Sequence, residues 1–174
     1  MKPIDLSNVS EATNYKSVTP GGYTCKITSV IDEEKKEYLR IEYDIADGEF
    51  KDYFSDLYKS KAFWAAHTIK SYKESALPFF KAFITAVESS NNGFKWDSDE
   101  TKLRGKYVGF VLAEEEYRKK DGTTGTRLYV DRPRSVDAIK AKDFKIPPKK
   151  LLPAEPPAPI DFTDLSGDDS DLPF

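Results

Sequence analysis

The sequence is poor in the residues that most metal and catalytic sites require. Its 174 residues include one cysteine, Cys25, and one histidine, His67. Disulfide frameworks need cysteine pairs, whereas zinc sites and histidine-based catalytic triads need several such residues in one cluster. The counts therefore exclude a disulfide scaffold and disfavour a zinc site. We expect Cys25 to be a small buried residue of a strand and His67 to be a packed or surface residue of a helix.

Long apolar runs and nucleotide-binding loops are missing as well. No stretch approaches the roughly 18 apolar residues that cross a bilayer, and the N-terminus lacks the apolar centre of a signal peptide, so we expect a cytoplasmic protein. Gly21 and Gly22 lack the spacing and the Lys-Ser/Thr pair of a phosphate-binding loop. The carboxylates form charged runs without a partner that would separate their pKa values. We expect no enzyme, metal or cofactor, while a catalytic site assembled from residues distant in sequence stays open.

The formal net charge of −3 combines two regions of opposite sign. Residues 161–174 contain five aspartates and no lysine or arginine, whereas the rest of the chain contains 27 basic and 25 acidic residues. A weakly basic body with an acidic tail differs from a uniformly acidic protein, because the body can still attract a polyanion. The charge distribution therefore keeps nucleic acid among the candidate partners.

Composition divides the chain into four segments. Residues 1–19 form a polar N-terminal arm, and residues 20–146 form one domain with alternating strand patterns. Residues 147–160 are rich in proline, which cannot donate the backbone hydrogen bonds of helices and sheets, so they predict a semi-extended linker. Residues 161–174 form an acidic tail that we expect to be unstructured.

The alternation of apolar and polar residues predicts five strands. The clearest covers residues 37–46, where Leu39, Ile41, Tyr43 and Ile45 share one face. Further strands are expected at residues 23–31, 48–54, 105–117 and 125–134. Helical spacing predicts a core helix in residues 77–90, with Phe79, Phe80, Phe83, Ile84 and Val87 on its apolar stripe, and a shorter helix from Lys59 to Lys70.

Three strands, a helical insert and a final hairpin follow the order of an OB-fold, a five-stranded barrel that commonly binds oligonucleotides. The sequence thus predicts a mainly β, OB-like barrel with helices between its third and fourth strands. A five-stranded sheet backed by helices would give a similar pattern.

Aromatic and basic residues interleave on the expected outer faces of these strands. Aromatic rings stack on unpaired bases, while lysine and arginine contact phosphates. The candidate nucleic-acid contacts are Tyr38, Arg40, Lys51, Tyr53, Lys106, Tyr107, Arg127 and Tyr129, together with Arg118, Lys119 and Lys120 at the tip between the last two strands. Neither expected helix has a basic face that could read the major groove of a duplex, so a single strand is favoured. RNA stays open as an alternative to DNA.

The last residues have a second chemical character. Three aspartates precede an aliphatic residue, a proline and a terminal aromatic ring, a combination that a small pocket with a basic rim could capture. This terminus resembles the tail of bacterial single-stranded DNA-binding proteins, which recruits replication, recombination and repair proteins. The resemblance implies partner binding by Asp168, Asp169, Asp171, Leu172, Pro173 and Phe174.

The body, from about Gly21 to Lys150, is similar to a family of bacteriophage proteins long labelled as a domain of unknown function and associated with single-stranded DNA binding. The similarity rests on GGYTCKI, EYLRIEYDIADGEFKDYF, FITAVESSNNGFKW, LRGKYVGFVLAEEEY, RLYVDRPRSVDAI and DFKIP, in that order. The expected helical insert at residues 59–90 is larger than the helix of a typical bacterial member, so contact residues and oligomeric state, including a homo-oligomer, do not transfer.

The resemblance implies a phage protein of the bacterial host cytoplasm. It would bind single-stranded DNA with little sequence preference during replication or recombination and recruit partners through its tail. The alternative is a protein-interaction adaptor whose OB-like domain has no direct role on DNA.

Overall fold

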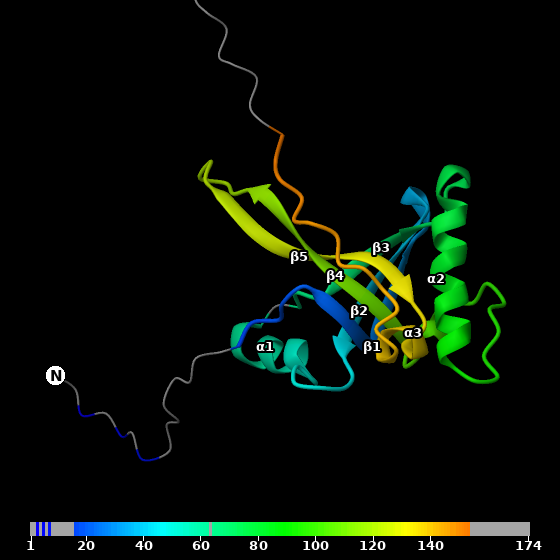
Figure 1. Cartoon of the computed structure of the whole chain (residues 1–174), viewed down its shortest axis with the longest axis horizontal. Coiled ribbons are helices and arrows are strands. Elements are labelled where there is room, and N and C mark those ends of the chain that lie inside the picture. Colours follow the sequence, from blue (N-terminus) through cyan, green and yellow to red (C-terminus); the bar gives the residue numbers. More distant parts are fainter. Residues whose placement is uncertain (1–2, 4, 6, 8–15, 63, 154–174) are drawn as a thin grey trace, which may run out of the picture.

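The computed structural model describes residues 3, 5, 7, 16–62 and 64–153, and within them five strands form one antiparallel sheet (Figure 1). The strands are β1 (Gly21–Glu33), β2 (Tyr38–Ile45), β3 (His67–Ser71), β4 (Tyr107–Arg118) and β5 (Thr124–Arg134). Their order across the sheet is β3-β2-β1-β4-β5, and no ladder joins the edge strands β3 and β5 in the described part of the chain. The mainly β architecture with a helical insert is confirmed, and it is consistent with a partly open OB-like fold.

Three helices accompany the sheet. They are α1 (Tyr53–Lys61), α2 (Leu77–Ser90) and the short α3 (Val136–Lys140), and single 3₁₀ turns lie at Glu34–Lys36, Glu74–Ala76 and Glu100–Leu103. The core helix of the sequence analysis is confirmed as α2, with Phe83, Ile84 and Val87 buried. Phe79 was expected in the core but is 75% exposed, because it lies in the first turn and the buried positions of α2 begin only at Phe83.

The strand expected at residues 48–54 does not form, because the side chain of Asp44 organises a helix start there. Its carboxylate accepts hydrogen bonds from the backbone N–H of Phe54 at 3.0 Å and of Ser55 at 2.9 Å, so the chain turns into α1. The helix expected from Lys59 to Lys70 is also wrong. α1 ends before Ala62, which has a left-handed φ of 54°, and the following residues pair with β2 as β3.

The hydrophobic core lies on the inner face of the sheet, between α1 and α2 (Figure 1). Leu39, Ile41, Tyr43 and Ile45 are buried there, as the alternation of β2 predicts. The ring of Phe110 packs against Tyr43, with 4.9 Å between centroids. Cys25 is fully buried as expected, and burial, followed by the negative charge of Asp44, raises the pKa of its thiol well above the ordinary value.

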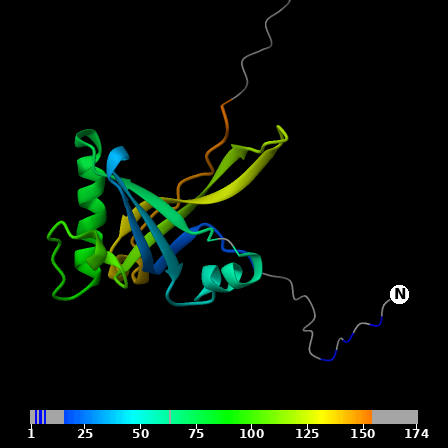
Figure 2. The ribbon, with the colours of Figure 1, turned by 180° about the vertical axis from the view of Figure 1, so that it is seen from behind.

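The outer face of the sheet is covered over β4 and over the first half of β1, which pairs with β4. Gly22 and Gly109 leave space for Ile139 of α3, and a Cβ atom at Gly109 would lie 2.4 Å from the Ile139 side chain. Phe144 fills the corresponding space above Gly22. Figure 1 shows α3 and the chain that follows it on the near side of the molecule, whereas in Figure 2 β2 and β3 face the viewer without a helix in front of them. The outer face of β2 and β3 is thus the part of the sheet left open.

Candidate nucleic-acid interface

The open outer face is built from three strands whose register places polar and apolar side chains in rows. Residues directly opposite each other on antiparallel strands point to the same face. Arg40 of β2 lies between Ile31 of β1 and Ile69 of β3. The two isoleucines are 42% and 53% exposed, which is high for such large apolar residues. The neighbouring row contains Tyr38, opposite Ser71.

Arg40 is held on this face but retains unused hydrogen-bonding capacity. Its guanidinium forms an ion pair with Glu42, with 3.2 Å between the atoms, and its side chain is 41% exposed. The Nε–H of Arg40 is buried and has no hydrogen-bond partner within residues 16–62 and 64–153. The exposed part of the guanidinium carries further N–H donors, which could contact a phosphate. The arrangement can therefore combine a phosphate contact with apolar support for a base.

The turn between β1 and β2 forms one border of this face. The Tyr72 hydroxyl donates a hydrogen bond to Asp32 at 2.8 Å, which joins the end of β1 to the segment after β3. This bond and the negative charges around it raise the pKa of Tyr72 to about 12. Lys36 of the turn lies with its ammonium 6.0 Å from the centre of the Tyr38 ring. The turn thus brings a cation to the aromatic side chain of the face.

The hairpin between β4 and β5 forms a second projection. Its tip, which carries Arg118, Lys119 and Lys120, is closed by a hydrogen bond of 3.0 Å from Gly122 N–H to the Lys119 carbonyl. In Figure 1 the hairpin tip lies at the upper left and the β1–β2 turn at the upper right, because the tip projects beyond Gly21 at one end of β1 and the turn follows Glu33 at the other. The corresponding loops border the oligonucleotide site in OB-folds, whereas here they lie at opposite ends of β1.

Arg127 and Tyr129 lie on the outer face of the hairpin and already have partners. The Arg127 guanidinium lies 5.3 Å from the centre of the Tyr117 ring and forms an ion pair of 2.8 Å with Glu115. The ammonium of Lys150 lies 3.8 Å from the centre of the Tyr129 ring. The backbone of Lys150 also pairs with the free edge of β4, so the C-terminal segment covers this ring.

Lys51 and Tyr53 do not lie on the sheet, because the expected third strand is absent. Both line a cleft of about 590 Å³ beside α1, together with Phe50, Leu57 and Lys61. Tyr53 is the first residue of α1 and Lys51 lies in the turn before it, whereas Tyr38 and Arg40 belong to β2. The structure therefore divides the expected contacts among several surfaces and does not gather them on one side.

Lys106 and Tyr107 belong to a further group at the start of β4. The Lys106 ammonium lies 4.8 Å from the centre of the Phe94 ring, and Tyr107 is 42% exposed opposite Lys26 of β1. The Asn91 side chain fixes this strand end by hydrogen bonds to the N–H and carbonyl of Tyr107, at 3.0 and 2.7 Å. This group is a basic and aromatic surface beside the covered part of the sheet.

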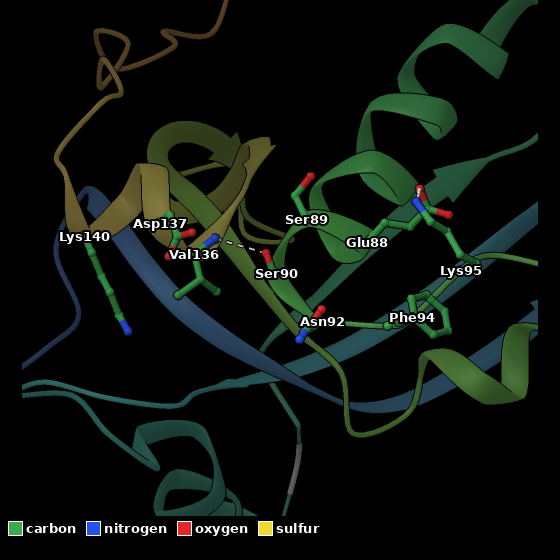
Figure 3. Close-up of a pocket in the computed structure, with 10 residues that line it drawn as sticks. Glu88, Ser89, Ser90, Asn92, Phe94, Lys95, Val136, Asp137 and Lys140 are labelled. Carbon is green, nitrogen blue, oxygen red and sulfur yellow. Dashed lines mark hydrogen bonds and ion pairs between the residues drawn. The ribbon is translucent and has the colours of Figure 1, made fainter.

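A polar pocket of about 560 Å³ adjoins that surface between the end of α2 and the start of α3 (Figure 3). Lys95 and Lys140 lie at its opposite sides, and Ser90 accepts a hydrogen bond from the N–H of Val136 at 3.0 Å. Lys95 is also 3.7 Å from Glu88, which offsets its charge. The pocket is open and its polar groups are engaged locally, so we assign it no chemistry.

Sequence patterns did not reveal several residues of these surfaces. Ile31 and Ile69 were missed because an isolated apolar residue on a strand indicates the core, and only the register shows that they flank Arg40 on the outside. Lys26 was missed because its neighbour across the sheet, Tyr107, is 81 residues away in sequence. The tail residues Asp168 to Phe174 lie outside the described residues.

No known protein-family model matches the sequence, and no curated protein sequence matches it. Among the described residues, no helix has the length and apolar character needed to traverse a membrane. Within the same residues, no three His, Cys, Asp or Glu side chains are grouped so that they could hold a metal ion.

Proposed function

We propose that this protein binds single-stranded DNA with little sequence preference during phage DNA replication or recombination, and that its acidic tail recruits partner proteins. The observation that carries the proposal is the open outer face formed by β2, β3 and the end of β1 at Ile31. It combines Tyr38, Arg40 and two exposed isoleucines beside the turn between β1 and β2, which carries Lys36.

Each group has a distinct role in this proposal. The Tyr38 ring stacks on a base, a contact of about 1–3 kcal/mol, and Ile31 and Ile69 pack against sugars and base faces. Arg40 exchanges part of its contact with Glu42 for a phosphate. Stacking and phosphate contacts do not distinguish among the bases, so binding depends little on sequence.

Fluorescence anisotropy with labelled oligo-dT and a duplex of equal length, at two salt concentrations, tests the DNA-binding function. We expect preference for the single strand and an affinity that falls as salt rises. Arg40→Ala should weaken binding about tenfold or more, since a charged contact contributes about 1.5–3 kcal/mol. Lys59→Ala is the matched control, because Lys59 pairs with Asp56 on α1, away from the open face. Equal affinity for single strand and duplex would refute the proposal.

A protein-interaction adaptor is the second candidate, and the exposure of Ile31 and Ile69 supports it, because exposed apolar side chains are common in protein interfaces. An adaptor would show no salt-sensitive oligo-dT binding, so the same titration separates the two functions. Recruitment by the tail has its own test. Deletion of residues 172–174 should leave oligo-dT affinity nearly unchanged and abolish capture of a purified replication or recombination protein.

A further inference from the structure

An apolar groove on α2 lies away from the open sheet face. It has a volume of about 540 Å³ and is lined by Leu77, Pro78, Phe80, Lys81, Ile84 and Trp96. The rings of Phe80 and Trp96 meet edge to face with 6.1 Å between centroids, and Leu77 is 46% exposed. Apolar surface of this kind at the border of a domain is a docking site for a small apolar group.

The single positive charge of the groove limits which ligands fit it. Lys81 is the only charged residue among those that line it. Lys81 is exposed and takes part in no ion pair within the described residues. A ligand with an apolar end and a negative charge close to it would satisfy both the groove and this ammonium. An uncharged apolar partner would use only half of the site.

The chain itself contains a segment with this chemistry. Residues 154–174 follow the last described residue and contain Leu172, Pro173 and Phe174 after a run rich in aspartate. Eighteen residues lie between Pro153 and Leu172 in the sequence, which allows a reach of about 60 Å. This reach exceeds the diameter of a domain of this size, about 30–40 Å, so the terminus can arrive at α2 from its own chain.

We propose that the C-terminal residues Leu172 to Phe174 occupy the α2 groove of the same chain. In this proposal the Phe174 ring would pack against Phe80 and Trp96, and the aspartates before it would supply negative charge near Lys81. A tethered segment has an effective concentration of about 1 mM. If the free peptide binds the groove with a Kd of about 0.1 mM, the tethered terminus at about 1 mM would occupy the groove in about 90% of intact chains. Docking and partner recruitment then compete for the same three residues.

The test uses a peptide of sequence GDDSDLPF with an N-terminal fluorophore, titrated with a chain that lacks residues 172–174. We expect a rise in anisotropy that saturates with a Kd of about 0.1 mM. The intact chain should bind the same peptide about tenfold more weakly, because its own terminus fills the groove. A peptide whose last residue is alanine should bind at least tenfold more weakly than the parent peptide.

Groove variants locate the site. Leu77→Ser and Lys81→Glu, both at exposed positions in α2, should each weaken peptide binding to the shortened chain at least tenfold. Lys61→Glu on α1 is the matched charge reversal and should leave binding unchanged. Circular dichroism of each variant checks that it is folded.

Three results would overturn the proposal: no binding of the peptide, equal binding by the groove variants, or equal binding by the intact and shortened chains. Light scattering supplies a further check. A molar mass above that of one chain, lost on Leu77→Ser, would show that a second copy occupies the groove instead.

Discussion

Replacement of Lys70 by methionine should stabilise the protein and change how its stability depends on pH. Lys70 belongs to the edge strand β3 and lies opposite the buried Leu39 of β2. Its side chain therefore points to the inner face of the sheet. Its ammonium is 5.9 Å from the centre of the Phe83 ring and forms no ion pair in the described part of the chain. Burial lowers the pKa of Lys70 from its ordinary 10.5 to about 8. The folded state therefore disfavours the charged ammonium.

The size and the sign of the effect follow from this pKa. A pKa lower by about 2.5 in the folded state corresponds to about 3 kcal/mol, and the partial exposure of the residue reduces this to about 1–3 kcal/mol. Between pH 8 and 10.5 the unfolded chain binds more protons at Lys70 than the folded chain does. The free energy of unfolding consequently rises with pH through this window, and below pH 8 the full penalty of the buried charge is present.

Urea unfolding of the wild type and of Lys70→Met at pH 7 and pH 10 measures the difference. We expect Lys70→Met to be more stable by about 1–3 kcal/mol at pH 7 and by clearly less at pH 10. Other lysines and tyrosines titrate in both proteins, so their contributions cancel in the comparison. A stability difference that is zero at pH 7, or equal at the two pH values, would refute the reasoning. Lys70→Arg, whose charge persists at both pH values, is the control.

Two further substitutions test the packing of α3 on the sheet and the start of α1. Gly109→Val should destabilise the fold by about 2–4 kcal/mol in urea unfolding, because its Cβ would lie 2.4 Å from Ile139 and 2.9 Å from the backbone oxygen of Arg134; unchanged stability would mean that α3 does not pack there. Asp44→Ala should lower the free energy of unfolding by about 1–3 kcal/mol, because the N–H groups of Phe54 and Ser55 lose their acceptor. The exposed Asp56→Ala is the control and should change it by less than about 1 kcal/mol.

The sequence was informative where local periodicity and tertiary contacts agree. The alternation from Leu39 to Ile45 predicts the inner face of β2, because these four side chains are all buried in the core, where Tyr43 and Ile45 lie opposite the buried Ile27 and Cys25 of β1. The spacing in α2 predicts its buried face from Phe83 onward for the same reason. In such segments every second or third residue is buried, and a single sequence contains that pattern.

The prediction failed where a distant residue decides the local structure. The segment before β3 contains alanine and tryptophan, which favour no sharp break, yet the chain leaves α1 at Ala62 and pairs with β2. The turn at residues 48–52 becomes a helix start because Asp44, on another element, accepts its N–H groups. Strand pairing and capping of this kind depend on contacts between elements, and intrinsic propensity does not reveal them.

The location of the candidate interface follows from what the other surfaces of the sheet are used for. The inner face is filled by α2 and the core, and the outer face of β1 and β4 accepts α3 only because Gly22 and Gly109 have no side chains. The exposed row of Ile31, Arg40 and Ile69 lies beyond this covered area, on the end of β1 and on β2 and β3. A bulky residue at Gly109 would displace α3 and uncover a second apolar surface on β1 and β4, so the covering of this part of the sheet depends on a glycine.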